Sequence, residues 1–170
     1  MSLRKLFNYS SVLALASVSV LGGQAYADGL TSTVAFKVVE ISATGEETLA
    51  ERNTVRPGEV IQYVLTHSNE AETDMSGLAI TAPIPEGGTV ELGSETSSLP
   101  AVFEIQAEME PENPGLEWSS LPAFRTVVDA DGTERREPVP ADAIAAVRWN
   151  LESALTSGET ALNTYRVVVN

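Results

Sequence analysis

The chain of 170 residues carries 24 acidic and ten basic side chains, which gives a formal net charge of −14, and it contains no cysteine. Nucleic-acid binding is not expected, because neutralising phosphates takes a basic surface. Attraction to anionic lipid is disfavoured for the same reason. Without cysteine there is no disulfide framework, so core packing and strand pairing must supply the stability.

The first 27 residues have the three parts of a secretory signal peptide. Arg4 and Lys5 are basic, residues 12–21 are apolar, and Ala25-Tyr26-Ala27 is a cleavage site before Asp28. The apolar run is shorter than the roughly 20 residues of a transmembrane helix, so a cleaved signal is preferred over an anchor. We therefore expect an exported protein, extracellular, at the cell surface or in the periplasm, without a stable membrane anchor.

Residues 28–170 are expected to form a single domain, a length that can bury a sizeable core. Removing residues 1–27 takes away two basic residues and no acidic one, so the formal net charge changes from −14 to −16. The plain interpretation of this charge is solubility in a salty exterior, where surface acids are screened.

Alternating apolar residues predict strands in the first half of the chain. The expected strands are residues 34–39, residues 59–66 after the Pro57-Gly58 turn, and residues 78–82 before a stretch rich in proline and glycine. The side chains expected to face the core are Val34, Phe36 and Val38 in the first strand, and Ile61, Tyr63 and Leu65 in the second. One-sided apolar faces of this kind indicate half-buried strands.

The second half continues the pattern. Residues 102–110 alternate without a break, and residues 124–139 are predicted to form a hairpin about Asp131-Gly132, a pair that tolerates the positive φ angles of a tight turn. Residues 111–122 look irregular and carry Trp118. Residues 143–155 suit a helix by composition, but Val147, Trp149 and Leu151 alternate with polar residues, so a strand is preferred there. Tyr165, Val167 and Val169 alternate in the same way and predict the last strand. Together these segments predict an all-β fold, an immunoglobulin-like antiparallel β-sandwich preceded by a cleaved signal peptide.

Three pieces in order resemble one family. They are VRPGEVIQY at 55–63 followed by Asn69, LAITAPIPEG at 78–87, and VRWNL at 147–151 followed by SGE at 157–159 and YRVVV at 165–169. This pattern is similar to the DUF11 domains, the conserved repeat modules of secreted and cell-surface proteins of bacteria and archaea. The resemblance implies an immunoglobulin-like sandwich and no assigned reaction.

No catalytic, cofactor-binding or metal-binding residue is predicted. Asp129 and Asp131 form half of a calcium-loop pattern, but the turn explains them and the remaining ligands are missing. The acidic row Glu104, Glu108 and Glu110 faces outward, which is the opposite of the apolar pocket that raises the pKa of a general acid. His67 is the only histidine, and we expect it at the surface near the end of a strand.

An isopeptide bond between Lys37 and Asn170 is disfavoured, because alternation points both side chains away from the core. The sequence is most consistent with a non-enzymatic structural or adhesive module that associates with itself or with another surface protein through sheet edges. Val38-Val39 and Val167-Val168-Val169 are the expected pairing stretches unless other strands cover them. The alternative is a carbohydrate-binding accessory domain that uses Trp118, and a sandwich fold alone does not exclude an enzyme.

Overall fold

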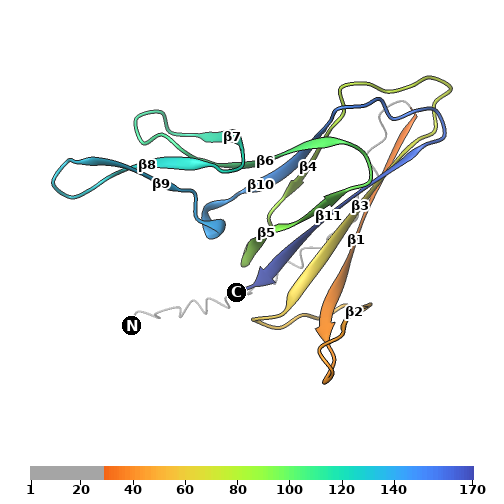
Figure 1. The fold of residues 1–170 in the computed structure, drawn as a ribbon, viewed down its shortest axis with the longest axis horizontal. Helices are drawn as coiled ribbons and strands as arrows, with labels where there is room; N and C mark the ends of the chain where they lie inside the picture. The colour runs from red at the N-terminus through yellow and green to blue at the C-terminus, as the bar shows by residue number, and fades with distance from the viewer. Residues whose placement is uncertain (1–28) are drawn as a thin grey trace, which may run out of the picture.

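The computed structural model describes residues 29–170, so the predicted signal peptide lies outside the described residues. Two antiparallel sheets form a sandwich, and a separate hairpin extends from one end of it (Figure 1). The all-β prediction is confirmed. No helix in the described part of the chain has the length and apolar character needed to cross a membrane.

The larger sheet has the strand order β2-β1-β3-β11-β5 and the smaller sheet the order β4-β10-β6-β7. The bounds in the larger sheet are β1 (Leu30–Ile41), β2 (Glu47–Ala50), β3 (Val60–Asn69), β5 (Gly88–Ser97) and β11 (Thr160–Val169). Those in the smaller sheet are β4 (Ala79–Pro83), β6 (Ala101–Glu108), β7 (Leu116–Ser120) and β10 (Ala146–Leu151). A short 3-10 helix, η1 (Ala141–Ala143), precedes β10.

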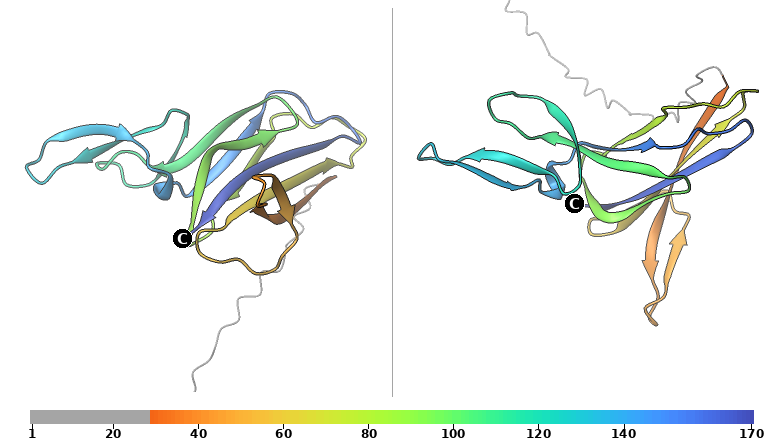
Figure 2. Two further views of the ribbon diagram at one scale, coloured as in Figure 1. Left: turned by 60° about the horizontal axis from the view of Figure 1, so that its bottom comes forward. Right: turned by 45° about the horizontal axis from the view of Figure 1, so that its top comes forward.

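The remaining strands, β8 (Phe124–Val128) and β9 (Glu134–Pro138), pair only with each other among the described elements. We call this hairpin the arm. It projects from the sandwich in both views of Figure 2. Its turn lies at the predicted place, but only Gly132 adopts a positive φ, of 84°, and the Gly132 amide donates to the Asp129 carbonyl at 2.9 Å, so the loop is longer than the predicted two residues.

The core lies between the two sheets and is centred on Trp149, which is 2% exposed. Its indole packs against Phe103 and Tyr165, with ring centroids 5.3 and 6.0 Å away. The alternation predicted for residues 102–110 and for residues around Trp149 is confirmed, since Ile105, Val147 and Leu151 are buried between the sheets. Residues 146–151 therefore form a strand and not a helix.

Buried Asn69, the asparagine that follows the first family-like piece, ties the loop after β3 to the chain before β11. Its amide nitrogen donates to the carbonyl oxygens of Thr73 and Leu155, each at 2.9 Å, and its amide oxygen accepts from the backbone of Ala71 at 3.0 Å. Every polar group of this buried amide is thus engaged, as burial requires.

β5 and β7 were not predicted. β5 occupies residues 88–97, and β7 lies inside residues 111–122, which looked irregular. β5 escapes the alternation rule because Gly93 has a φ of 89° and the pairing with β11 shifts register between Thr164 and Arg166. A bulge of this kind breaks the period of two on which strand prediction depends.

Candidate interaction site

Neither of the predicted pairing stretches is free. Val167-Val168-Val169 belongs to β11, which pairs with β3 on one side and with β5 on the other. Val38 and Val39 pair with β3 and also with β2. These valines are therefore covered and do not form open edges, because β2 pairs with Val38-Val39 and β5, missed in the sequence, covers the outer side of β11.

The open edge lies in the first part of β1 instead. β3 pairs with β1 from Leu30 to Val39, whereas β2 pairs only with Val38–Ile41. Residues 30–37 therefore have no strand on their second side among the described residues. We call residues 30–36 of this stretch the β1 edge.

The backbone groups that point out of the β1 edge can be assigned from the pairing. The Gly29 carbonyl accepts a hydrogen bond from the Glu70 amide at 2.6 Å. Because bonded and non-bonded pairs alternate in an antiparallel ladder, the odd-numbered residues of β1 bond to β3. On the other side the Ser42 amide donates to the Glu46 carbonyl at 2.8 Å, in agreement. The amide and carbonyl groups that point outward belong to Leu30, Ser32, Val34 and Phe36.

Two apolar side chains line this edge. Val34 is 66% and Phe36 is 41% exposed, so the prediction that both face a core was wrong. Both lie on the sandwich side of the larger sheet, opposite Leu65 and Tyr63. The core, however, extends only to Leu30 and Tyr63 in this region. The alternation identified the correct face, but the second sheet does not extend far enough to cover it.

An aromatic row connects the β1 edge to the core. Phe36 lies 6.3 Å from Tyr63, which stacks on Tyr165 at 5.0 Å, and Tyr165 in turn contacts Trp149. The Tyr165 hydroxyl donates to the Pro83 carbonyl at 3.2 Å, and burial raises its pKa. The exposed ring of Phe36 is thus backed by side chains with fixed positions, which lowers the entropy cost of binding against it.

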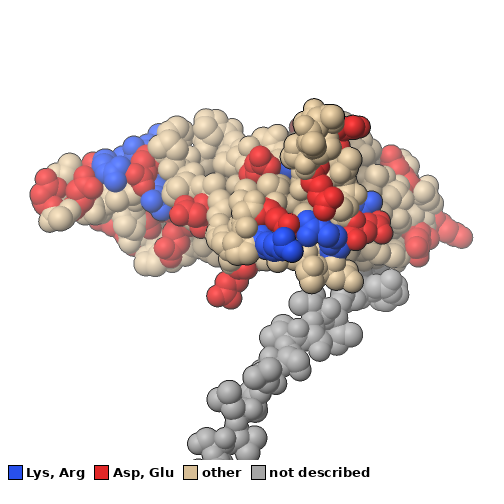
Figure 3. Space-filling model, turned by 90° about the horizontal axis from the view of Figure 1, so that it is seen from below, with Lys and Arg blue, Asp and Glu red and all other residues tan. Residues whose placement is uncertain are grey.

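The β1 edge carries no charge from Leu30 to Phe36. Figure 3 shows acidic side chains spread over one face of the molecule, with the basic groups lying among them. The nearest charged group, Lys37, pairs with Glu51 at 3.4 Å. A neutral edge in so acidic a protein lacks the charge that commonly blocks edge-to-edge pairing.

The other edges described are protected. β5 carries Glu91 and Glu95 and is bulged at Gly93, β2 carries Glu47, β4 ends in Pro83, β7 carries Glu117, and both strands of the arm carry charged side chains. Charges, bulges and prolines are the features that discourage strand addition. The β1 edge therefore stands out as the best candidate for binding another strand.

The indole ring of Trp118 is less accessible to a ligand than predicted. It lies on β7, not in an irregular loop, and the Arg148 guanidinium carbon lies 4.2 Å from its ring centroid. Glu104 holds that arginine at 2.6 Å. One face of the indole is therefore already occupied, which weakens its use as a platform for sugar rings.

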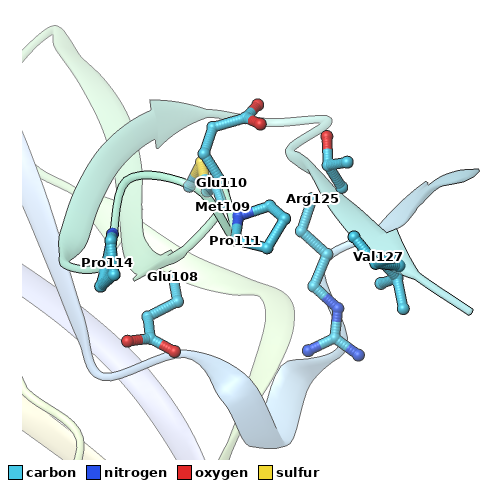
Figure 4. Close-up of a pocket in the computed structure, with 9 residues that line it drawn as sticks. Glu108, Met109, Glu110, Pro111, Pro114, Arg125 and Val127 are labelled. Carbon is cyan, nitrogen blue, oxygen red and sulfur yellow. The ribbon is translucent and has the colours of Figure 1, made fainter. Parts of the chain in front are cut away.

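The acidic row does not form a pair of catalytic carboxylates. The hydrogen bond from Arg148, followed by one from Asn150, lowers the pKa of Glu104, whereas a general acid needs a raised one. Glu108 and Glu110 border an open pocket of about 540 Å³ beside the arm, and in Figure 4 their carboxylates point away from each other. Arg125, across this pocket, is paired with Glu137 at 2.7 Å.

The residues considered for calcium binding and for an isopeptide bond have other partners. Asp129 pairs with Arg135 at 3.1 Å, and no cluster of three metal-ligating side chains occurs within residues 29–170. Lys37 and Asn170 bond to different partners, since Asn170 accepts from Thr89 at 3.1 Å.

His67 was expected at the surface but is half-buried on the sandwich side of β3. Its Nδ1 is buried and has no hydrogen-bond partner among the described residues. Burial lowers its pKa, so the neutral form is favoured in the folded chain.

The sequence held one signal for the β1 edge that was not used. Residues 30–36 read LTSTVAF, a strand with neither charge nor proline. No protein-family model, no curated protein and no solved structure matches this chain.

Proposed function

We propose that this chain is an exported, non-enzymatic structural or adhesive module of the cell surface or extracellular matrix. It binds protein partners by strand addition at the β1 edge. The observation that carries this proposal is an uncharged edge with outward backbone groups at four residues and two exposed apolar side chains, Val34 and Phe36.

Strand addition suits this geometry. An added strand takes its affinity from main-chain hydrogen bonds and its specificity from alternate side chains. The outward groups of residues 30–36 supply the hydrogen bonds, and the side chains of Val34 and Phe36 supply an apolar contact. The carbohydrate-binding alternative has less support, because Arg148 already lies over the Trp118 ring.

The test is the size of the full chain in solution, measured by light scattering across protein concentration. We expect assemblies larger than a monomer for the unmodified chain, and a monomer for Val34→Pro. The Val34 amide points away from β3, so proline removes an edge donor without removing a hydrogen bond of the monomer.

Val34→Ile is the matched control, because it keeps the amide, the β-branched shape and the apolar surface of the side chain. It should assemble like the unmodified chain. Circular dichroism and thermal unfolding of Val34→Pro must match the unmodified chain for the comparison to hold. An unmodified chain that stays monomeric at every concentration would contradict the proposal.

A further inference from the structure

We infer that the strand added at the β1 edge is β1 of a second copy, paired antiparallel about a two-fold axis through Thr33. This inference rests on the proposed function and adds the identity of the partner and the register of the pairing. Three properties of the edge carry it: its length, the direction of its backbone groups and its charge.

Both ends of the β1 edge are fixed. At one end Gly29 has a φ of 83°, which lies outside the extended range of a strand, and a Cβ there would lie 2.6 Å from the Ala71 side chain. At the other end Ala50 of β2 already pairs with Val38. The free window has Leu30, Ser32, Val34 and Phe36 as its outward residues, and Thr33 stands at its centre.

A two-fold pairing centred on Thr33 uses this window completely. Leu30 lies opposite Phe36 of the other copy, and Ser32 lies opposite Val34, so outward groups meet outward groups at every bonded position. A shift by one residue would set outward groups against residues that already bond to β3. A shift by two would leave one end unpaired or drive it into β2. One register therefore satisfies all the edge groups of both copies.

The side chains agree with this register. Residues directly opposite each other in a ladder share a face, so Phe36 of one copy lies beside Leu30 of the other on the sandwich side. Val34 approaches Ser32 and, diagonally, Val34 of the partner. The two most exposed apolar groups of the edge become covered by the pairing, and the two larger sheets join into one continuous sheet.

Charge favours a copy of the same neutral edge. Both copies carry a net negative charge and repel each other, but residues 30–36 add no charged side chain at the contact, so pairing there brings no like charges directly together. A partner selected by opposite charge would need acidic side chains at this edge to bind. We therefore expect added salt to strengthen the pairing, because screening weakens the repulsion between copies.

A single cysteine tests the register directly, since the chain has none of its own. Thr33 on the axis faces its own counterpart at a non-bonded position, where Cα atoms are about 4.5 Å apart, within the span of a disulfide. Under mild oxidation the full-length Thr33→Cys chain should form covalent dimers.

Thr31→Cys and Ala35→Cys are the matched controls, because they lie on the same face of the same strand. Alone, each should cross-link at least tenfold more slowly than Thr33→Cys, since its counterpart lies four residues along the strand. Mixed together they should cross-link to each other, because Thr31 lies opposite Ala35 of the partner.

The outcomes separate the two proposals. If the unmodified chain assembles and Val34→Pro does not, but Thr33→Cys cross-links no faster than its controls, the register is wrong and the proposed function stands. If the mixed controls stay unlinked while Thr33→Cys dimerises, the antiparallel pairing is also overturned. If the unmodified chain stays monomeric at every concentration and salt level, both proposals fail.

Discussion

The sandwich and the arm hold together by different means. In the sandwich, Trp149 and its neighbours are sealed between two sheets. In the arm, two strands of five residues pair through a tight turn, a chain of ion pairs links Arg125, Glu137, Arg135 and Asp129, and Arg136 lies over the Phe124 ring. An isolated hairpin is marginal in water, and exposed ion pairs add little. We therefore expect the arm to open locally at a lower free energy than the sandwich.

The two tryptophans provide the strongest test of this comparison. Trp149→Ala should lower the free energy of unfolding by about 3–5 kcal/mol, because it removes a buried indole and leaves a cavity between the sheets. Trp118→Ala should cost clearly less, since this side chain lies on the edge strand β7 and is only partly covered. Denaturant unfolding of both variants measures the difference, and equal losses would contradict the assignment of the core.

A second test concerns His67 and affects the sandwich alone. Burial lowers its pKa from the ordinary value of 6.5, so the unfolded chain binds this proton more readily. Stability should therefore decline as the pH falls below about 6.5, and His67→Gln should lose that decline. A second decline below about 4.5 should persist in both proteins, because hydrogen bonds from Arg52 and Arg148 lower the pKa values of Glu59 and Glu104. Thermal unfolding across pH 4–8 would show no difference between the two proteins if His67 were freely hydrated.

The smallest effect is expected in the arm. Glu137 bonds to both Arg125 and Arg135, and Glu137→Gln should leave the global unfolding transition unchanged. Amide exchange in β8 and β9 should nevertheless become faster, because the hairpin loses the acid that links its strands. Glu134→Gln is the matched control on the same strand, since the Glu134 carboxylate has no hydrogen bond or ion pair among the described residues. A large shift in global stability would show that the arm belongs to the cooperative core.

Alternation predicted the strands well where one face is buried along the whole element, as in β6 and β10. It failed for β5, whose bulge at Gly93 interrupts the period, and for the short strand β7 between turn residues. It also misjudged Val34 and Phe36, because the width of the second sheet is a property of the assembled fold and not of β1 itself.

The sequence predicted the kind of site, a sheet edge, but not the strand that forms it. Sheet edges were expected to carry the function, but the valines of β11 were chosen because they are the most apolar. Whether a strand lies at an edge depends on the order of strands in the sheet. The prediction lacked β5, which pairs with β11 and so removes β11 from the edge. Charge was the better guide, since residues 30–36 lack it.

The position of β11 between β3 and β5 has a consequence for the order of folding. Tyr165 lies opposite Tyr63, a partner from the first half of the chain, and no local hairpin can replace this pairing. Until residues 160–169 are available, β3 and β5 each lack a neighbour and expose a row of unpaired backbone groups. Pairings so distant in sequence are slow to form. During that interval the like charge of the chains, by keeping them apart, should protect them from aggregation.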